Sequence, residues 1–286
     1  MGMNLRSRFL AFGIVAPIAL FLLLNASLRI VFGLALSLLA SLELKSNLDR
    51  GIGCQSSVLM RLIWALFAPG IVFAAVMYGE SGLLHATNGA MILICCLYVI
   101  LQVGHSKTDT TIHLQLLATC FCTWYIGCNI GYAALLNKQQ WALDVLIYVI
   151  VVIGVGETGA LFGGAVFGRH RVSWISPGKT LEGYVAAVLT GVLASLAFDA
   201  LHGFFFPASK FPLVGSRSIA LPCVISIAGS LGDLVESLIK RGLNIKDMGT
   251  VLLGWGGLLD RIDGLLFAFP ATYYYLAAYY PSAIET

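Results

Sequence analysis

The residues of this chain that could do chemistry are charged side chains gathered in an otherwise hydrophobic sequence. Residues 240–263, which read KRGLNIKDMGTVLLGWGGLLDRID, include seven Asp, Lys and Arg residues. The whole chain of 286 residues has only 17 Lys and Arg and 14 Asp and Glu, so nearly a quarter of its charge lies in this segment. Acidic residues can bind cations and basic residues can bind phosphate groups.

A polar stripe lies just upstream, on the helix expected to lead into this segment. Its members are spaced i, i+3, i+4 and i+7: Asp233, Glu236, Ser237 and Lys240. Side chains with this spacing share one face of an α-helix. Because the stripe follows an apolar run, its carboxylates are expected to face a cavity, a partner charge or an ion.

Three carboxylates could together hold a metal ion. Asp260 and Asp263 are three residues apart and share a face of the helix expected after Gly256 and Gly257. With Asp233 they supply the hard oxygen ligands that Mg²⁺ prefers. Three basic residues supply the positive charge that a polyphosphate requires: Lys240, Arg241 and Lys246. A metal site beside phosphate-binding residues favours phosphoryl or nucleotidyl transfer.

A simpler interpretation is open for part of this set. Basic residues at a helix end, such as Lys240 and Arg241, are often topology signals or lipid-headgroup contacts. The adjacent Asp260 and Arg261 could form a helix cap or a surface ion pair. Neither explanation accounts for Asp233 inside an apolar segment, so the set as a whole indicates a site.

The elements that must position these residues are transmembrane helices. Hydrophobic residues make up 59% of the chain and charged residues 11%, and the mean hydropathy is +0.90. Because soluble domains are typically about a quarter charged, this composition excludes a soluble protein and predicts an all-α, polytopic transmembrane helix bundle. We expect one integral-membrane domain over residues 1–286, with N-terminal spans in 1–150 and the catalytic spans and cytoplasmic loops in 151–286.

Apolar runs long enough to cross a membrane, about 20 residues each, predict about nine spans. They lie near residues 9–25, 27–43, 58–78, 82–104, 112–135, 141–167, 182–206, 217–239 and 264–281. With the N-terminus in the cytoplasm, 13 of the 17 basic residues fall on the inner side, as the positive-inside rule favours. The outer side keeps four: Arg29, Lys138, Lys210 and Arg217. The charged segment 240–263 then faces the cytoplasm.

The spacing of the polar residues resembles a known family. One pattern over 27 residues is similar to the signature of phosphatidate cytidylyltransferases, also called CDP-diacylglycerol synthases: Ser237, Lys240, Arg241, Lys246, Asp247, Gly249, Gly256, Gly257, Asp260, Arg261 and Asp263. The upstream segment GALFGGAVFGRHRVSWISPGKTLEG is similar to the other cytoplasmic segment of that family. The resemblance runs from about residue 156 to the C-terminus, whereas the first 150 residues match only in being hydrophobic spans.

The resemblance implies a reaction in which CTP and phosphatidate give CDP-diacylglycerol and pyrophosphate. It implies Mg²⁺ bound by Asp233, Asp260 and Asp263, with a companion cation such as K⁺. Residues implied to hold the phosphates of CTP or of the lipid are basic: Lys240, Arg241 and Lys246. Residues implied to orient the substrates or to line the nucleotide side are Ser176, Lys179, Thr180, Ser237, Asp247 and Arg261. Expected partners are CTP, phosphatidate and the lipid bilayer, with no nucleic acid, and a homodimer is one candidate assembly.

Two positions depart from the family pattern. Trp255 stands where the family has His, and Trp has no acid–base chemistry that could replace that of His. Glu157 stands where the family typically has Asp, which moves the charge outward by one methylene. These departures concern the rate or the exact substrate, not the class of reaction.

Two other functions are open at this stage. A lipid-alcohol kinase that uses CTP could employ the same residues, and a transporter could use Asp233 in an ion pathway. Inverted repeats would support a transporter, and none is evident in the sequence. The expected location is a bacterial inner membrane, with the active site facing the cytoplasm.

Overall fold

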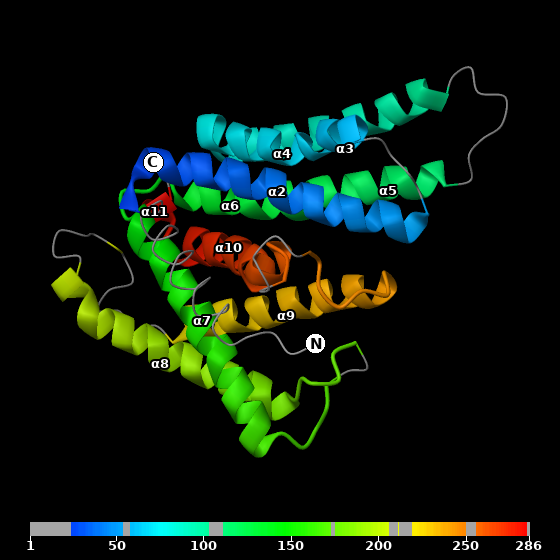
Figure 1. Cartoon of the computed structure of the whole chain (residues 1–286). Coiled ribbons are helices and arrows are strands. Elements are labelled where there is room, and N and C mark those ends of the chain that lie inside the picture. The colour runs from blue at the N-terminus through cyan, green and yellow to red at the C-terminus, as the bar shows by residue number, and fades with distance from the viewer. Residues whose placement is uncertain are drawn as a thin grey trace. The chain divides into compact units, whose positions relative to one another are not determined.

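The fold is known from a computed structural model, which describes residues 24–53, 58–102, 111–172, 175–205, 211, 219–249 and 256–284. Within these ranges the elements are helices and no strand occurs (Figure 1). An isolated β-bridge joins Arg171 and Thr180. The prediction of an all-α fold is therefore confirmed for the described residues.

The chain divides into two compact units. Unit 1 comprises residues 1–135 and 242–261, and unit 2 comprises residues 136–241 and 262–286. The segment 242–261 is thus grouped with the N-terminal helices. The assignment of one membrane domain stays a prediction.

The helices of unit 1 begin with α2, which Asn25 caps by accepting a hydrogen bond from the backbone N–H of Ser27 at 3.0 Å. The helical elements are α2 (Ala26–Ile52), α3 (Val58–Ala65), α4 (Phe67–Gln102), α5 (Ile112–Cys122), the π-helix η1 (Thr123–Cys128) and α6 (Asn129–Leu136). Within this unit α2 packs against α3, α4, α5 and η1, and α4 packs against α2, α3, α5 and η1, so these two helices form its centre. Figure 1 shows α2 in blue beside α5.

The segment from α3 to the end of α4 folds back on itself at Gly79. Gly79 has φ 70° and ψ −149°, a conformation outside the helical region that glycine adopts most easily. The Trp64 and Tyr98 rings are stacked with centroids 4.9 Å apart. A continuous helix would separate them by about 50 Å, so the chain must reverse between them. The runs expected at 58–78 and 82–104 are thus two antiparallel segments.

One face of α2 carries a buried polar stripe with a spacing of four residues: Ser37, Ser41, Lys45 and Asp49. Lys45 and Asp49 form an ion pair, and the side chain of each is 3% exposed. Charged residues within a membrane span usually face the interior of the bundle and pair with each other. The apolar remainder of α2 is left for contact with lipid or with other helices.

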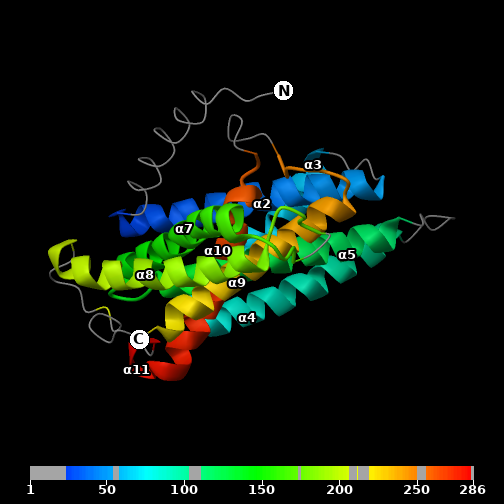
Figure 2. The same cartoon turned by 90° about the horizontal axis from the view of Figure 1, so that it is seen from below.

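Unit 2 contains α7 (Ala142–Phe167), α8 (Leu181–Phe205), α9 (Ala220–Gly242), α10 (Leu259–Tyr279) and α11 (Pro281–Ile284), with the first residues of α10 assigned to unit 1. Among the described elements of this unit, the most extensive contact is between α7 and α8, which lie next to each other in Figure 1 and Figure 2. Buried polar pairs join these two helices. Tyr148 and Ser195 share a hydrogen bond of 2.9 Å, and His202 Nε2 lies 3.3 Å from Asp144 Oδ1.

Five stretches among the described residues are long and apolar enough to cross a membrane: Ala26–Ile52, Met60–Leu101, Ala142–Phe167, Leu181–Phe204 and Ala220–Gly242, of which Met60–Leu101 contains the reversal at Gly79. These helices make the chain an integral membrane protein. The run expected at 9–25 lies almost wholly outside the described residues. The count of about nine spans and the cytoplasmic N-terminus stay predictions.

Candidate active site

The predicted polar stripe lies on one helix, as its spacing indicates. Helix α9 runs without interruption through Asp233, Glu236, Ser237 and Lys240. Lys240 Nζ lies 2.5 Å from Glu236 Oε2, and the two residues of this ion pair are one helical turn apart. The Glu236 side chain is completely buried, while that of Lys240 is 15% exposed. A buried carboxylate of this kind requires a positive partner.

Helix α10 brings Asp263 to the same place because α9 has glycine at the point of contact. A Cβ atom added to Gly232 would overlap the backbone carbonyl oxygen of Asp263, so only glycine allows the two helices to approach this closely. Asp263 is 7% exposed, and its Oδ1 accepts a hydrogen bond of 2.8 Å from the backbone N–H of Gly264. The close approach therefore buries a second carboxylate beside α9.

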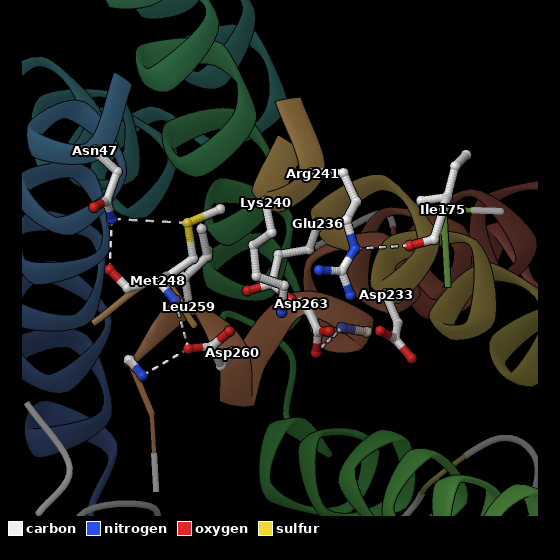
Figure 3. A network of polar contacts seen from close by, with 12 residues as sticks. Asn47, Ile175, Asp233, Glu236, Lys240, Arg241, Met248, Leu259, Asp260 and Asp263 are labelled. Carbon is white, nitrogen blue, oxygen red and sulfur yellow. Dashed lines mark hydrogen bonds and ion pairs between the residues drawn. The ribbon is translucent and has the colours of Figure 1, made fainter. Parts of the chain in front are cut away.

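Three carboxylates converge where α9 meets α10. One oxygen from each of Asp233, Glu236 and Asp263 lies within 4.8 Å of the other two, and Figure 3 shows these side chains next to one another. Opposite ligands of an octahedral Mg²⁺ site are about 4.2 Å apart, so the trio has the oxygen ligands for such an ion, and its oxygens would need to move only slightly closer to bind one. Sequence reasoning placed Glu236 on the polar stripe but did not count it among the metal ligands.

The loop between α7 and α8 adds a positive charge to this cluster. Lys179 forms an ion pair with Asp233, and their side chains are 26% and 30% exposed. The loop is held by backbone hydrogen bonds, including one of 3.1 Å from Val172 N–H to the carbonyl of Lys179. Arg241 Nε donates to the carbonyl of Ile175 at 3.1 Å (Figure 3), which ties the end of α9 to the same loop.

The electrostatics of the cluster depend on burial and on opposite charges. Burial lowers the pKa of Lys179, while the neighbouring carboxylates Asp263 and Glu157 act in the opposite direction. Lys240 lowers this pKa further, and Glu236 raises it. Two ammonium groups and three carboxylates leave an excess of negative charge, which a cation would neutralise.

The predicted nucleotide-side residues lie around the loop. Ser176 accepts a backbone hydrogen bond of 3.0 Å from Lys179 through its carbonyl, which closes a turn. Thr180 Oγ1 accepts one of 3.1 Å from Gly183 N–H, so Thr180 caps the start of α8. Ser237 is 9% exposed on α9. These contacts position the loop, and a direct role in nucleotide binding stays a prediction.

In unit 1, Asp260 binds the backbone of the polar segment. Its Oδ2 accepts hydrogen bonds from Met248 N–H at 2.9 Å and from Gly257 N–H at 2.7 Å, as Figure 3 shows in part. Asn47 on α2 donates to the carbonyl of Met248. Gly256 has φ +88°, a conformation that residues other than glycine rarely adopt. Asp260 therefore organises its own loop, and its role as a metal ligand stays a prediction.

The remaining predicted residues of unit 1 are exposed: Lys246, Asp247 and Arg261. Exposed positions are compatible with the predicted contacts to phosphates.

Trp255, the first departure from the family pattern, lies outside the described residues. Glu157, the second departure, lies on α7, with its Oε1 3.4 Å from the place where a Cβ on Gly264 would be. Glu157 is thus a neighbour of the segment that carries Asp263.

Sequence reasoning missed Glu43 altogether. Glu43 is on α2, at the end of the run expected at 27–43, and its carboxylate accepts hydrogen bonds from Leu258 N–H at 3.2 Å and Leu259 N–H at 2.8 Å. The signal that could have found it is an acidic residue on the polar end of an apolar helix, shortly before Lys45 and Asn47. Nothing in local spacing indicates a partner more than 200 residues away.

Comparison with known proteins decides the family. A profile of the cytidylyltransferase family matches residues 6–279, almost the whole chain. The chain belongs to the cytidylyltransferase family. The matched segment thus includes both units, the carboxylate trio and the loop of Asp260.

Among its relatives is a phosphatidate cytidylyltransferase from Bacillus subtilis (strain 168), 34% identical over 158 residues, which are 54% of this chain and 56% of the relative. A protein of the same name from Staphylococcus haemolyticus (strain JCSC1435) is 36% identical over 148 residues, 51% of this chain and 53% of the relative. One from Staphylococcus aureus (strain COL) is 34% identical over a segment of the same length. This member of the cytidylyltransferase family therefore aligns with about half the length of the curated relatives it matches.

Proposed function

We propose that this protein transfers the cytidylyl group of CTP to phosphatidate, giving CDP-diacylglycerol and pyrophosphate. The observation that carries the proposal is the carboxylate trio of Asp233, Glu236 and Asp263, faced by Lys179 and Lys240. The trio lies in a chain of the cytidylyltransferase family whose relatives are named phosphatidate cytidylyltransferase. Carboxylates for a cation beside ammonium groups for phosphates are what nucleotidyl transfer between two anions needs.

In the proposed reaction a phosphate oxygen of phosphatidate attacks the α-phosphorus of CTP. A new P–O bond forms there, the bond between the α-phosphorus and the bridging oxygen breaks, and pyrophosphate leaves with that electron pair. The attacking oxygen already carries negative charge, so no general base is required. Catalysis then depends on holding two anions in line and neutralising their charge.

The residues of the cluster have complementary parts in this scheme. Asp233, Glu236 and Asp263 would hold Mg²⁺, which when bound would neutralise charge on the CTP phosphates. On the family pattern of the sequence we also propose that Asp260 binds a cation and that K⁺ is a companion cation. With the carboxylates occupied in this way, the Lys179 and Lys240 ammonium groups are released to bind phosphate oxygens. Further phosphate and substrate contacts are proposed for Arg241, Lys246, Ser176, Thr180, Ser237, Asp247 and Arg261.

We also propose the arrangement of the protein in its membrane. About nine spans with a cytoplasmic N-terminus would place the segment 240–263 on the cytoplasmic side, where CTP is available. The bacterial relatives favour a bacterial inner membrane. The phosphate of phosphatidate would then meet the charged cluster at the membrane surface, while its acyl chains stay among the apolar helices.

Incubation of the purified full chain in detergent with CTP, phosphatidate and Mg²⁺ tests the proposal. CTP labelled at the α-phosphate should transfer its label to the lipid fraction, and CTP labelled at the γ-phosphate should release it as pyrophosphate. Omitting phosphatidate or adding EDTA should abolish both signals. Transfer of the γ-label to diacylglycerol, supplied in place of phosphatidate, would instead identify a lipid-alcohol kinase, and no CTP-dependent lipid product from phosphatidate would refute the proposal.

A further inference from the structure

The Glu43 carboxylate binds the N-terminus of α10 from a distant part of the chain. Helix α10 begins at Leu259, and Glu43 accepts hydrogen bonds from the N–H groups of Leu259 and Leu258 through its two oxygens. The first N–H groups of a helix have no partner within the helix. A negative charge there also interacts favourably with the helix dipole. Glu43 therefore caps α10, as a local Asp or Ser does in other helices.

Two glycines of the polar segment leave the space that this carboxylate occupies. A Cβ on Gly249 would overlap Glu43 Oε1, and a Cβ on Gly257 would lie 2.5 Å from the same oxygen. Both glycines belong to the pattern by which the sequence resembles a family, although neither can do chemistry through a side chain. Their contact with Glu43 gives a physical reason why glycine is needed at these two positions.

The same backbone that Glu43 binds also holds Asp260. Gly257 N–H donates to Asp260 Oδ2 at 2.7 Å, and Asp260 follows Leu259 directly in the first turn of α10. Met248 N–H donates to the same oxygen of Asp260, which joins the segment before Gly249 to that turn. Displacing the Glu43 carboxylate would therefore free the first turn of α10 and change the direction of the Asp260 side chain.

We infer that Glu43 is a positioning residue for the proposed reaction, acting through Asp260, and that Gly249 and Gly257 provide the space for its carboxylate. The inference rests on the proposed function where it concerns the reaction. The anchoring of α10 by Glu43 can be measured without any reaction, so the two can fail separately.

Hydrogen–deuterium exchange of the full chain tests the anchor. In Glu43→Ala, amides in residues 256–262 should exchange about tenfold faster than in the unaltered chain, the size of effect expected for losing a helix cap. Glu43→Gln keeps the side-chain size and one acceptor oxygen, so its exchange rate should lie between those of the unaltered chain and Glu43→Ala. It replaces Glu43→Ala in the experiment if that variant does not fold. Glu80→Ala, which removes an exposed glutamate of the same unit, is the matched control and should not change this exchange. Unchanged exchange in both Glu43 variants would overturn the inference.

A magnesium titration tests whether the anchor positions the reaction. The Mg²⁺ concentration for half-maximal synthesis of CDP-diacylglycerol should rise about tenfold or more in Glu43→Ala, as for other residues that orient metal ligands. Faster exchange with an unchanged Mg²⁺ response would overturn the positioning role and leave Glu43 as a cap only. If the unaltered chain makes no CDP-diacylglycerol, the proposed function fails, and the positioning role fails with it. The exchange experiment still tests whether Glu43 caps α10.

A double-mutant cycle tests the role of the glycines. Gly257→Ala should speed the exchange of residues 256–262 by about as much as Glu43→Ala, because the added methyl displaces the carboxylate. Adding Gly257→Ala to Glu43→Ala should change the exchange little further, since the atoms that clash are gone. Fully additive effects of the two substitutions would show that Gly257 does not act through Glu43.

Discussion

Replacing Glu236 with Gln would remove one charge from the carboxylate trio and leave the shape of the site nearly unchanged. Glu236 is completely buried, and its oxygen lies 2.5 Å from Lys240 Nζ. If Glu236 helps to hold the cation, the loss of its charge should lower activity by about a hundredfold or more, because metal neutralisation is worth several kcal/mol. The measurement is the rate of CDP-diacylglycerol formation per folded molecule at saturating CTP and phosphatidate.

The same substitution should also lower stability, by an amount that the geometry limits. Removing one partner of a fully buried ion pair costs about 3–5 kcal/mol. The expected loss is smaller, about 1–2 kcal/mol, because 15% of the Lys240 side chain is exposed and because repulsion among three carboxylates is relieved. Thermal unfolding of the protein in detergent measures this loss of stability. Glu236→Gln combined with Lys240→Met should recover most of the stability and none of the activity.

A second buried pair in the chain provides the control for lost stability. Lys45 and Asp49 on α2 have the same i, i+4 spacing, and both side chains are 3% exposed. Asp49→Asn should therefore lower stability at least as much as Glu236→Gln, while activity per folded molecule stays within about threefold. Activity within threefold in Glu236→Gln would refute the assignment of the trio. An equal loss of activity in Asp49→Asn would show that stability alone explains the result.

Further substitutions test other residues of the proposed site. Asp260→Asn keeps an oxygen that can accept from the backbone but loses the charge, so activity should fall about a hundredfold or more; a value near that of the unaltered chain would exclude Asp260 as a ligand. Lys179→Met breaks the ion pair with Asp233 and should raise the KM for CTP by about tenfold or more, and an unchanged KM in a CTP titration would remove Lys179 from the phosphate site. Cysteines introduced at Asn244 and Ser209 should react with impermeant reagents from opposite faces of the membrane, and labelling from one face would contradict the nine-span arrangement. Trp255→His should leave activity within a few-fold, because the attacking oxygen needs no base; a gain of about tenfold with a new ionisation in the pH–rate profile would contradict this.

Local spacing determined much of what the site contains. The i, i+3, i+4 and i+7 pattern of Asp233, Glu236, Ser237 and Lys240 predicted one helical face, and α9 has that face. Hydrophobic runs likewise predicted an all-helical membrane protein, because lipid leaves the backbone few other ways to satisfy its hydrogen bonds. The reversal between 58–78 and 82–104 could be predicted because the polar break between two apolar runs is a property of neighbouring residues.

Only the tertiary structure decided which distant residues complete the charged groups. Lys179 reaches Asp233 across 54 residues of chain because the loop between α7 and α8 folds back beside α9, and Glu43 reaches Leu259 across 216. Neither pairing leaves a periodic signal, since a buried charge requires only that some opposite charge or donor be present, wherever it lies in the sequence. The need for glycine at position 232 likewise becomes clear only from the Asp263 backbone packed against it. Spacing along one helix is set by the geometry of the backbone, whereas contact between helices is set by how whole surfaces pack.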